Sequence, residues 1–174
     1  MSPEGSGEPR GGAPVDPEER LPVRRALVSV FDKEGLDRLA GALAAARPDV
    51  VCLAGFMRIL GPGFVRAFPG RILYTHPSLL PAFRGAHAVR DALAYGVKVT
   101  GCTVHLVDEE VDHGPVLFQS AVPVEPGDDE DRLHERIKRE ERRLLPLAVR
   151  LLAEGRVRVE GRRAQLVTAE EVSR

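Results

Sequence analysis

The sequence has little of several features that would assign it to a particular class of protein. Its 174 residues include only 2 cysteines, and 25 basic residues nearly balance 26 acidic ones. This balance creates no field that attracts nucleic acid or a membrane surface, so a small-molecule partner is expected. No apolar run approaches the roughly 20 residues that span a bilayer, and the N-terminus has no apolar signal segment. These shortages favour a cytoplasmic protein.

The cysteines fit that interpretation. Cys52 and Cys102 lie in apolar runs typical of buried strands, where a reduced thiol behaves as a small hydrophobic group, so no disulfide is expected. Residues 1–20 are rich in Gly, Pro, Glu and Ser and predict a disordered tail. The remaining residues, 21–174, suffice for a single domain with a sizeable core, because 43% of the chain is hydrophobic.

The order of apolar patterns predicts an α/β fold. A strand at 24–31, a helix at 33–47 and a strand at 49–55 form one βαβ unit, whose apolar strands are typical of a parallel sheet covered on both faces. Further along, an antiparallel pair of strands is expected near the C-terminal side, followed by a long helix and a short hairpin. The remaining expected elements are a helix at 62–68, strands at 71–75, 97–107 and 116–124, helices at 87–95 and 129–155, and hairpin strands at 157–159 and 165–167.

Two stretches carry polar groups where a ligand site is expected. His76 ends the strand at 71–75 and precedes prolines that stop regular structure, which places an imidazole at the rim of the sheet. The alternative for His76 alone is a histidine that merely terminates a strand. The second stretch, residues 101–115, contains Asp112, and its alternative role is that of a loop aspartate that caps a turn.

Together, Tyr74-Thr75-His76-Pro77-Ser78-Leu79-Leu80-Pro81 and residues 101–115 resemble the active-site signatures of the folate-dependent formyltransferases. The wording from His76 to Pro81 is most similar to phosphoribosylglycinamide (GAR) formyltransferase, and the resemblance runs from about residue 48 to 152. It implies a Rossmann-like formyltransferase fold with a mostly parallel sheet. It also implies transfer of formyl from 10-formyltetrahydrofolate, as cosubstrate, to the amine of glycinamide ribonucleotide in purine biosynthesis, with no metal. The domain would then comprise an N-terminal strand and helix at 21–47, a formyltransferase core at 48–155 and a C-terminal hairpin and tail at 156–174.

The resemblance also implies roles for individual residues. His76 and Asp112 are expected to be catalytic, and Glu141 falls at the carboxylate that contacts the ribonucleotide. A solvated helix face is the alternative for Glu141, and an apolar loop packed under a helix is the alternative for residues 57–60. The residues expected to bind the folate are Met57, Arg58, Ile59, Leu60, Asp108, Glu109 and Val111.

The chemistry of formyl transfer explains why these residue types fit. The reaction needs a stabiliser for the tetrahedral oxyanion, a route for the proton that leaves the attacking nitrogen, and exclusion of water. His76 can hold the developing negative charge. Asp112 can raise the proton affinity of the imidazole through its charge and can relay protons.

Two features depart from the family pattern. Tyr74 stands where the family has asparagine, and loss of an oxyanion donor costs on the order of 10²–10³ in turnover. Residues 23–46 resemble the start of the bifunctional IMP cyclohydrolase and AICAR formyltransferase, with Glu34 in place of a threonine. The Gly-rich loop that receives the substrate phosphate is missing, so part of the N-terminal nucleotide-binding half is lacking. Lys33 could attract a phosphate there, or could be an ordinary surface lysine.

These departures leave alternatives to a GAR formyltransferase. One is a non-catalytic folate-binding remnant or fusion product. Another is a related formyl-folate hydrolase, or a formyltransferase that acts on another amine. The sequence does not fix the oligomeric state.

Overall fold

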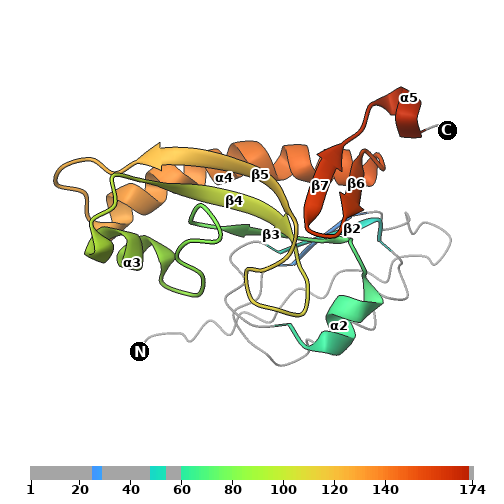
Figure 1. Cartoon of the computed structure of the whole chain (residues 1–174), viewed down its shortest axis with the longest axis horizontal. Coiled ribbons are helices and arrows are strands. Elements are labelled where there is room, and N and C mark those ends of the chain that lie inside the picture. The colour runs from blue at the N-terminus through green and yellow to red at the C-terminus, as the bar shows by residue number, and fades with distance from the viewer. Residues whose placement is uncertain (1–24, 29–47, 54–59, 173–174) are drawn as a thin grey trace, which may run out of the picture.

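The structure is a computed structural model that describes residues 25–28, 48–53 and 60–172. Within these ranges, seven strands form one sheet with the order β1-β2-β3-β4-β5-β7-β6. Figure 1 shows the sheet with the long helix α4 running across it. The expected tail at 1–20 and the expected helix at 33–47 lie outside the described residues.

The sheet is mixed, as the sequence pattern predicts. Its first three strands, β1 (Arg25–Val28), β2 (Val50–Leu53) and β3 (Ile72–His76), are parallel. The antiparallel part consists of β4 (Val99–Leu106) and β5 (Val116–Pro123). A C-terminal hairpin made of β6 (Val157–Glu160) and β7 (Arg163–Leu166) extends the sheet, and β7 pairs with β5 at one position.

The helices are α2 (Pro62–Ala67), α3 (Ala88–Tyr95), α4 (Glu130–Ala153) and α5 (Ala169–Val172), of which only the short α5 was not expected. Asp129 begins α4 because its side chain accepts a hydrogen bond from the Arg132 amide at 2.8 Å. The apolar residues of α4 recur at helical spacing and form one buried stripe: Leu133, Ile137, Leu144, Ala148 and Leu151.

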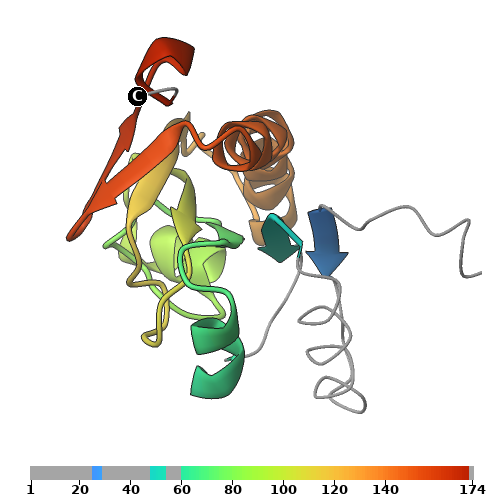
Figure 2. The ribbon, with the colours of Figure 1, turned by 90° about the vertical axis from the view of Figure 1, so that its right-hand side faces the viewer.

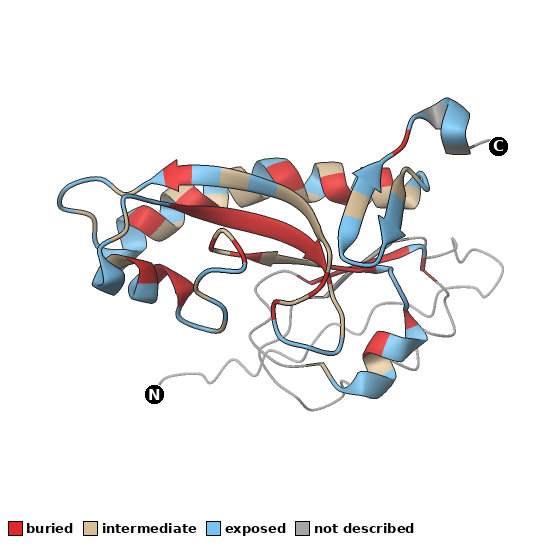
Figure 3. Cartoon of the chain, in the orientation of Figure 1, coloured by how far each residue is buried: buried red, intermediate tan, exposed pale blue. Residues whose placement is uncertain are grey.

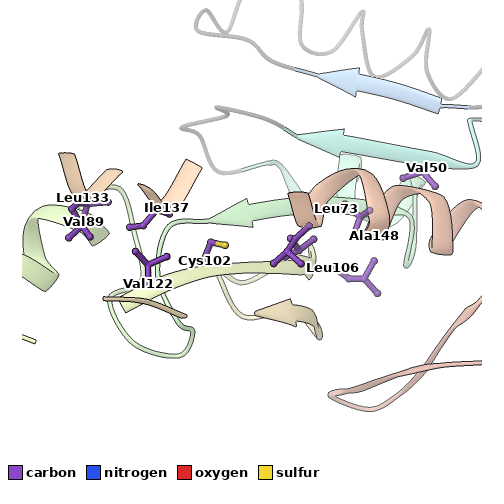
Figure 4. Close-up of a cluster of buried hydrophobic side chains, with 11 residues drawn as sticks. Val50, Leu73, Val89, Cys102, Leu106, Val122, Leu133, Ile137 and Ala148 are labelled. Carbon is purple, nitrogen blue, oxygen red and sulfur yellow. The ribbon is translucent and has the colours of Figure 1, made fainter. Parts of the chain in front are cut away.

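One face of the sheet packs against that stripe. Successive residues of a strand point to opposite faces, so Leu73 of β3 and Cys102, Val104 and Leu106 of β4 share the α4 side. Figure 4 shows Leu73, Leu106 and Ala148 meeting in this cluster. Figure 3 shows β4 buried along almost its whole length. This core fixes the positions of β3 and β4, the strands that carry the polar residues of the candidate site.

The opposite face of the sheet packs against α2. Val51, Leu53 and Ile72 form a second apolar cluster there with Phe68, which follows α2. Tyr74 packs against this cluster as well. Figure 2 looks nearly along α4 and shows α2 on the other side of β2. The side chains of Tyr74 and His76, which alternate with Leu73 and Thr75 along β3, therefore emerge on the α2 face, away from the main core.

Close packing between β4 and β5 generates a first prediction. A Cβ added at Gly101 would lie 2.0 Å from the carbonyl oxygen of Ser120 and 2.9 Å from Leu79 Cδ2, so the strands would have to separate. We expect Gly101→Ala to lower the free energy of unfolding, measured in urea, by about 1–3 kcal/mol.

Gly63→Ala is the matched control. Gly63 lies in α2, and no atom comes within 4 Å of its added Cβ. Alanine is also the better helix former, by up to about 1 kcal/mol. This variant should therefore be neutral or slightly more stable than the parent. Equal stability of the two variants would show that β4 and β5 do not approach as closely as described.

Candidate active site

His76 is the last residue of β3, and only 2% of its surface is exposed. Its Nε2 lies 2.8 Å from the carbonyl oxygen of Phe83. A carbonyl can only accept, so Nε2 carries a hydrogen. Its Nδ1 lies 3.3 Å from Oδ2 of Asp112. The imidazole is therefore held between the loop that follows β3 and the loop that follows β4.

Asp112 lies in that second loop, residues 107–115. Its backbone is left-handed, with φ at 49°, an uncommon conformation for a residue other than glycine. The carboxylate is buried, and its Oδ2 accepts a hydrogen bond from the amide of Gly85 at 2.8 Å. Its other oxygen, Oδ1, lies 3.8 Å from Nε2 of His105. One buried carboxylate thus faces two imidazoles.

The register of β3 and β4 explains this convergence. Tyr74 is paired with His105 and His76 with Thr103, and residues paired in an antiparallel ladder project to the same face. All four side chains are therefore on the α2 face. The family resemblance implied that His76 and Asp112 would meet, and in the structure the two side chains lie 3.3 Å apart.

A hydrogen-bond network around Thr103 secures the loop that follows His76. Thr103 Oγ1 donates to the carbonyl of Ser78 at 2.7 Å and accepts from the amide of Leu80 at 3.0 Å. The Gln119 side chain donates to Thr103 Oγ1 at 3.0 Å and to the Leu80 carbonyl at 2.9 Å. Two neighbouring strands thereby hold the backbone that leads to the Phe83 carbonyl.

His105 is a site residue that the sequence analysis did not single out. Its Nδ1 donates to the carbonyl of Leu106 at 2.8 Å, so Nε2 presents a lone pair. Burial lowers the pKa of His105, which keeps the ring neutral. In the described part of the chain, Nε2 has no hydrogen-bond partner. The alternation of His105 with Thr103 along β4 was the sequence feature that could have placed His105 on the same face of the sheet.

Tyr74 lines the site beside His105. The two rings meet edge to face, with centroids 5.9 Å apart. Burial, followed by the negative charges of Asp112 and Glu141, raises the pKa of Tyr74 to about 12. The phenol therefore keeps its proton at neutral pH and can donate a hydrogen bond.

A pocket of about 340 Å³ opens above these side chains. Its wall includes four of the residues expected to bind a folate: Leu60, Asp108, Glu109 and Val111. Met57, Arg58, Ile59 and Lys33 lie outside the described residues. Among the described residues, no group of three or more His, Cys, Asp or Glu side chains could hold a metal, and no helix could cross a membrane.

Glu141 does not line this pocket. It lies on α4 and accepts a hydrogen bond at 2.9 Å from the hydroxyl of Thr75. Thr75 alternates with Tyr74 and His76 along β3, so it projects to the α4 face of the sheet. The carboxylate expected to contact the ribonucleotide is therefore on the far side of β3 from the imidazole of His76.

Comparisons with known proteins identify relatives of this chain. The model of the formyl transferase family matches residues 20–149. Phosphoribosylglycinamide formyltransferase of Mycobacterium tuberculosis (strain ATCC 25618 / H37Rv) is 62% identical over 128 residues, which are 74% of this chain and 60% of that protein. The chain thus spans about 60% of the length of this relative.

Solved structures show the same likeness. Glycinamide ribonucleotide transformylase 1 from Symbiobacterium toebii superposes with a TM-score of 0.74 at 51% identity, over 79% of this chain and 66% of that one. A formyltetrahydrofolate deformylase from Pseudomonas syringae pv. tomato gives 0.73 at 32% identity, over 79% and 46%. These similarities confirm the expected Rossmann-like formyltransferase fold.

The comparisons do not support one expectation from the sequence. Residues 23–46 were expected to resemble the start of the bifunctional IMP cyclohydrolase and AICAR formyltransferase. The formyl transferase model instead begins its match at residue 20 and runs through that stretch. A short turn-like pattern at 29–35 was too brief to identify a different enzyme.

The lowered pKa of buried His105 generates a second prediction. A histidine in the unfolded chain takes up a proton near its ordinary pKa of about 6.5, whereas the folded protein resists protonation of His105. The free energy of unfolding should therefore fall as the pH drops below about 6.5, by at most about 1.4 kcal/mol per pH unit for this group.

We expect His105→Gln to flatten this dependence in denaturation curves recorded from pH 7.5 to 5. His87, exposed at the start of α3, provides the control variant His87→Gln. An unchanged slope in His105→Gln would assign the acid sensitivity to other groups.

Proposed function

Because this chain belongs to the formyl transferase family, we propose that it transfers a formyl group from 10-formyltetrahydrofolate to the amine of glycinamide ribonucleotide in cytoplasmic purine biosynthesis. The observation that carries the proposal is the meeting of His76 and Asp112, 3.3 Å apart, beneath a pocket of about 340 Å³. The volume is within the range of small-molecule sites.

The walls of the pocket suit a folate. Leu53, Leu60 and Val107 supply apolar surface for a flat ring, and the loop that contains Asp108 and Glu109 supplies acceptors for amino groups of the pterin. We assign Met57, Arg58 and Ile59 to the same subsite on the strength of the family resemblance. This composition, mostly apolar with a few convergent polar groups, is typical of cofactor sites.

Attack of the amine on the formyl carbon creates an oxyanion, and two residues can stabilise it. The protonated hydroxyl of Tyr74 is a hydrogen-bond donor at the position where the family has asparagine. The Nε2 hydrogen of His76 is committed to Phe83. The Phe83 carbonyl at Nε2 and Asp112 at Nδ1 orient the ring, which lines the pocket and places a polar group beside the oxyanion.

The proton of the attacking amine has a defined route. Asp112 Oδ1 and His105 Nε2 are both acceptors, and they lie 3.8 Å apart. An amine in the pocket can donate an N–H to Asp112, and the buried Nε2 of His105 lies behind that carboxylate. As the new C–N bond forms, the amine loses a proton to this pair. The bond from the formyl carbon to the folate nitrogen then breaks, and the relayed proton ends on that nitrogen.

A second candidate function rests on the structural likeness to the Pseudomonas syringae deformylase, in which water would replace the amine. A third is folate binding without turnover, which Tyr74 and the missing phosphate loop favour. Purified protein with 10-formyltetrahydrofolate separates them. Formylation of glycinamide ribonucleotide supports our proposal, formate release without that amine supports hydrolysis, and binding without either product supports the remnant.

Loss of the carboxylate generates a third prediction. Asp112→Asn keeps the shape of the side chain and can still accept from the Gly85 amide, but it cannot take a proton from the amine. We expect kcat to fall about 10²–10⁴-fold, with the Kd for 10-formyltetrahydrofolate nearly unchanged. Steady-state kinetics and fluorescence titration measure the two quantities. A kcat within threefold of wild type would remove Asp112 from the proton route.

The hydroxyl of Tyr74 generates a fourth prediction. Tyr74→Phe keeps the ring against His105 and removes the donor, so we expect turnover to fall about 10²-fold. Tyr74→Asn restores the amide of the family and should exceed the activity of the natural chain. Equal turnover of the natural chain and Tyr74→Phe would mean that another group holds the oxyanion.

A further inference from the structure

The C-terminal hairpin makes contact with the loop that carries Asp112. Arg162, in the turn between β6 and β7, directs Nη1 to His113 Nε2 and Nη2 to the His113 carbonyl oxygen, each at 2.6 Å. The hairpin lies beside the start of β5, where the loop ends (Figure 1). The match to the formyl transferase model stops at residue 149, so this contact comes from a segment beyond it.

The neighbours of His113 determine which of its ring nitrogens carries the hydrogen. Its Nδ1 lies 2.7 Å from Oδ2 of Asp108 and donates to that carboxylate. Its Nε2 therefore has a lone pair, which accepts from the guanidinium. Asp108 in turn accepts the amide of Glu110 through Oδ1 at 3.0 Å. A continuous chain of hydrogen bonds thus runs from Arg162 through His113 and Asp108 into the backbone of the loop.

This chain acts on the residue next to the carboxylate of the site. Asp112 precedes His113, and its left-handed backbone is a conformation that its neighbours must impose. The Gly85 amide holds the side chain of Asp112. Arg162 holds the following residue by both its backbone and its ring.

We propose that Arg162 is a positioning residue, which holds the loop at 107–115 in the conformation that aims Asp112 at His76 and completes the folate wall. The proposal rests on the proposed formyl transfer. It assigns to the C-terminal hairpin a role in the site that neither the strand pattern nor the family match indicates.

An exposed ion pair usually contributes little, because solvent screens it and long side chains lose freedom in forming it. Arg162 differs in its geometry. The planar guanidinium engages two acceptors of one residue, and bidentate recognition of this kind restricts orientation as well as distance. The Asp108 carboxylate holds the ring of His113 in the orientation that Arg162 needs.

The test compares Arg162→Ala with Arg162→Lys and Arg163→Ala. A lysine can reach only one of the two acceptors at a time. Arg163 is the adjacent exposed arginine, and in the described structure its side chain makes no hydrogen bond to the loop, so it controls for loss of charge. Amide hydrogen exchange of residues 108–114 is measured first, without ligand. Binding of 10-formyltetrahydrofolate and steady-state kinetics follow.

We expect Arg162→Ala to speed exchange in the loop, to lower kcat and to weaken folate binding, each about tenfold, with KM for glycinamide ribonucleotide unchanged. Arg162→Lys should give intermediate values, and Arg163→Ala should match wild type. A double variant with His113→Ala should be no worse than His113→Ala alone, because both substitutions break the same contact.

The possible failures are distinguishable. If wild type does not formylate the amine, the proposed function fails, and exchange and folate binding still decide the role of Arg162. Faster exchange with wild-type folate affinity and kcat overturns the positioning role. Unchanged exchange would show that Arg162 does not hold the loop at 107–115. Strict additivity of Arg162→Ala with His113→Ala would show the same.

Discussion

A buried carboxylate that must be given donors is the constraint on which the site depends. Only 8% of Asp112 is exposed, and a carboxylate without partners at that depth would be strongly unfavourable. Both donors, the amide of Gly85 and the imidazole of His76, come from the end of β3 and the loop that follows it, far from Asp112 in the sequence. They meet Asp112 because β3 and β4 are neighbours and the loop that follows β4 returns to the end of β3. The sheet pairing is thus what makes the left-handed loop at Asp112 tolerable.

The same two strands serve stability and chemistry through opposite faces. Leu73 of β3 and Val104 of β4 point to the α4 stripe, and no part of either is exposed. Tyr74 and His105, one position further along each strand, point to the pocket. Because the side-chain period of a strand is two, a register shift of one residue would move both sets to the wrong face. The apolar core therefore determines the positions of the polar groups as strictly as hydrogen bonds do.

The sequence predicted those parts of the site that depend on residues close together in the chain. A strand end followed by Pro77 was enough to place His76 at the rim of the sheet, whereas the proximity of Asp112 was implied only by the family resemblance, because β3 and β4 are antiparallel and end at opposite edges. The orientation of Glu141 could not be predicted in this way, because it depends on which face of the sheet α4 covers. The contact of Arg162 with His113 joins residues 49 positions apart and depends on how the hairpin docks on β5, which has no local pattern. The resemblance of residues 23–46 rests on few residues, and the comparisons do not support it.

The two imidazoles of the site show how environment assigns opposite roles to one residue type. The Leu106 carbonyl accepts a hydrogen bond from Nδ1 of His105, and burial lowers the pKa of the ring, so the buried Nε2 keeps a lone pair beside Asp112. His76 has a carbonyl beside one nitrogen and a carboxylate beside the other, and these two groups fix the orientation of its ring. One ring is then suited to accept a proton from an attacking amine and the other to stabilise negative charge. This division of roles follows from the acceptors around each ring, and Asp112 lies between the two rings as the group they share.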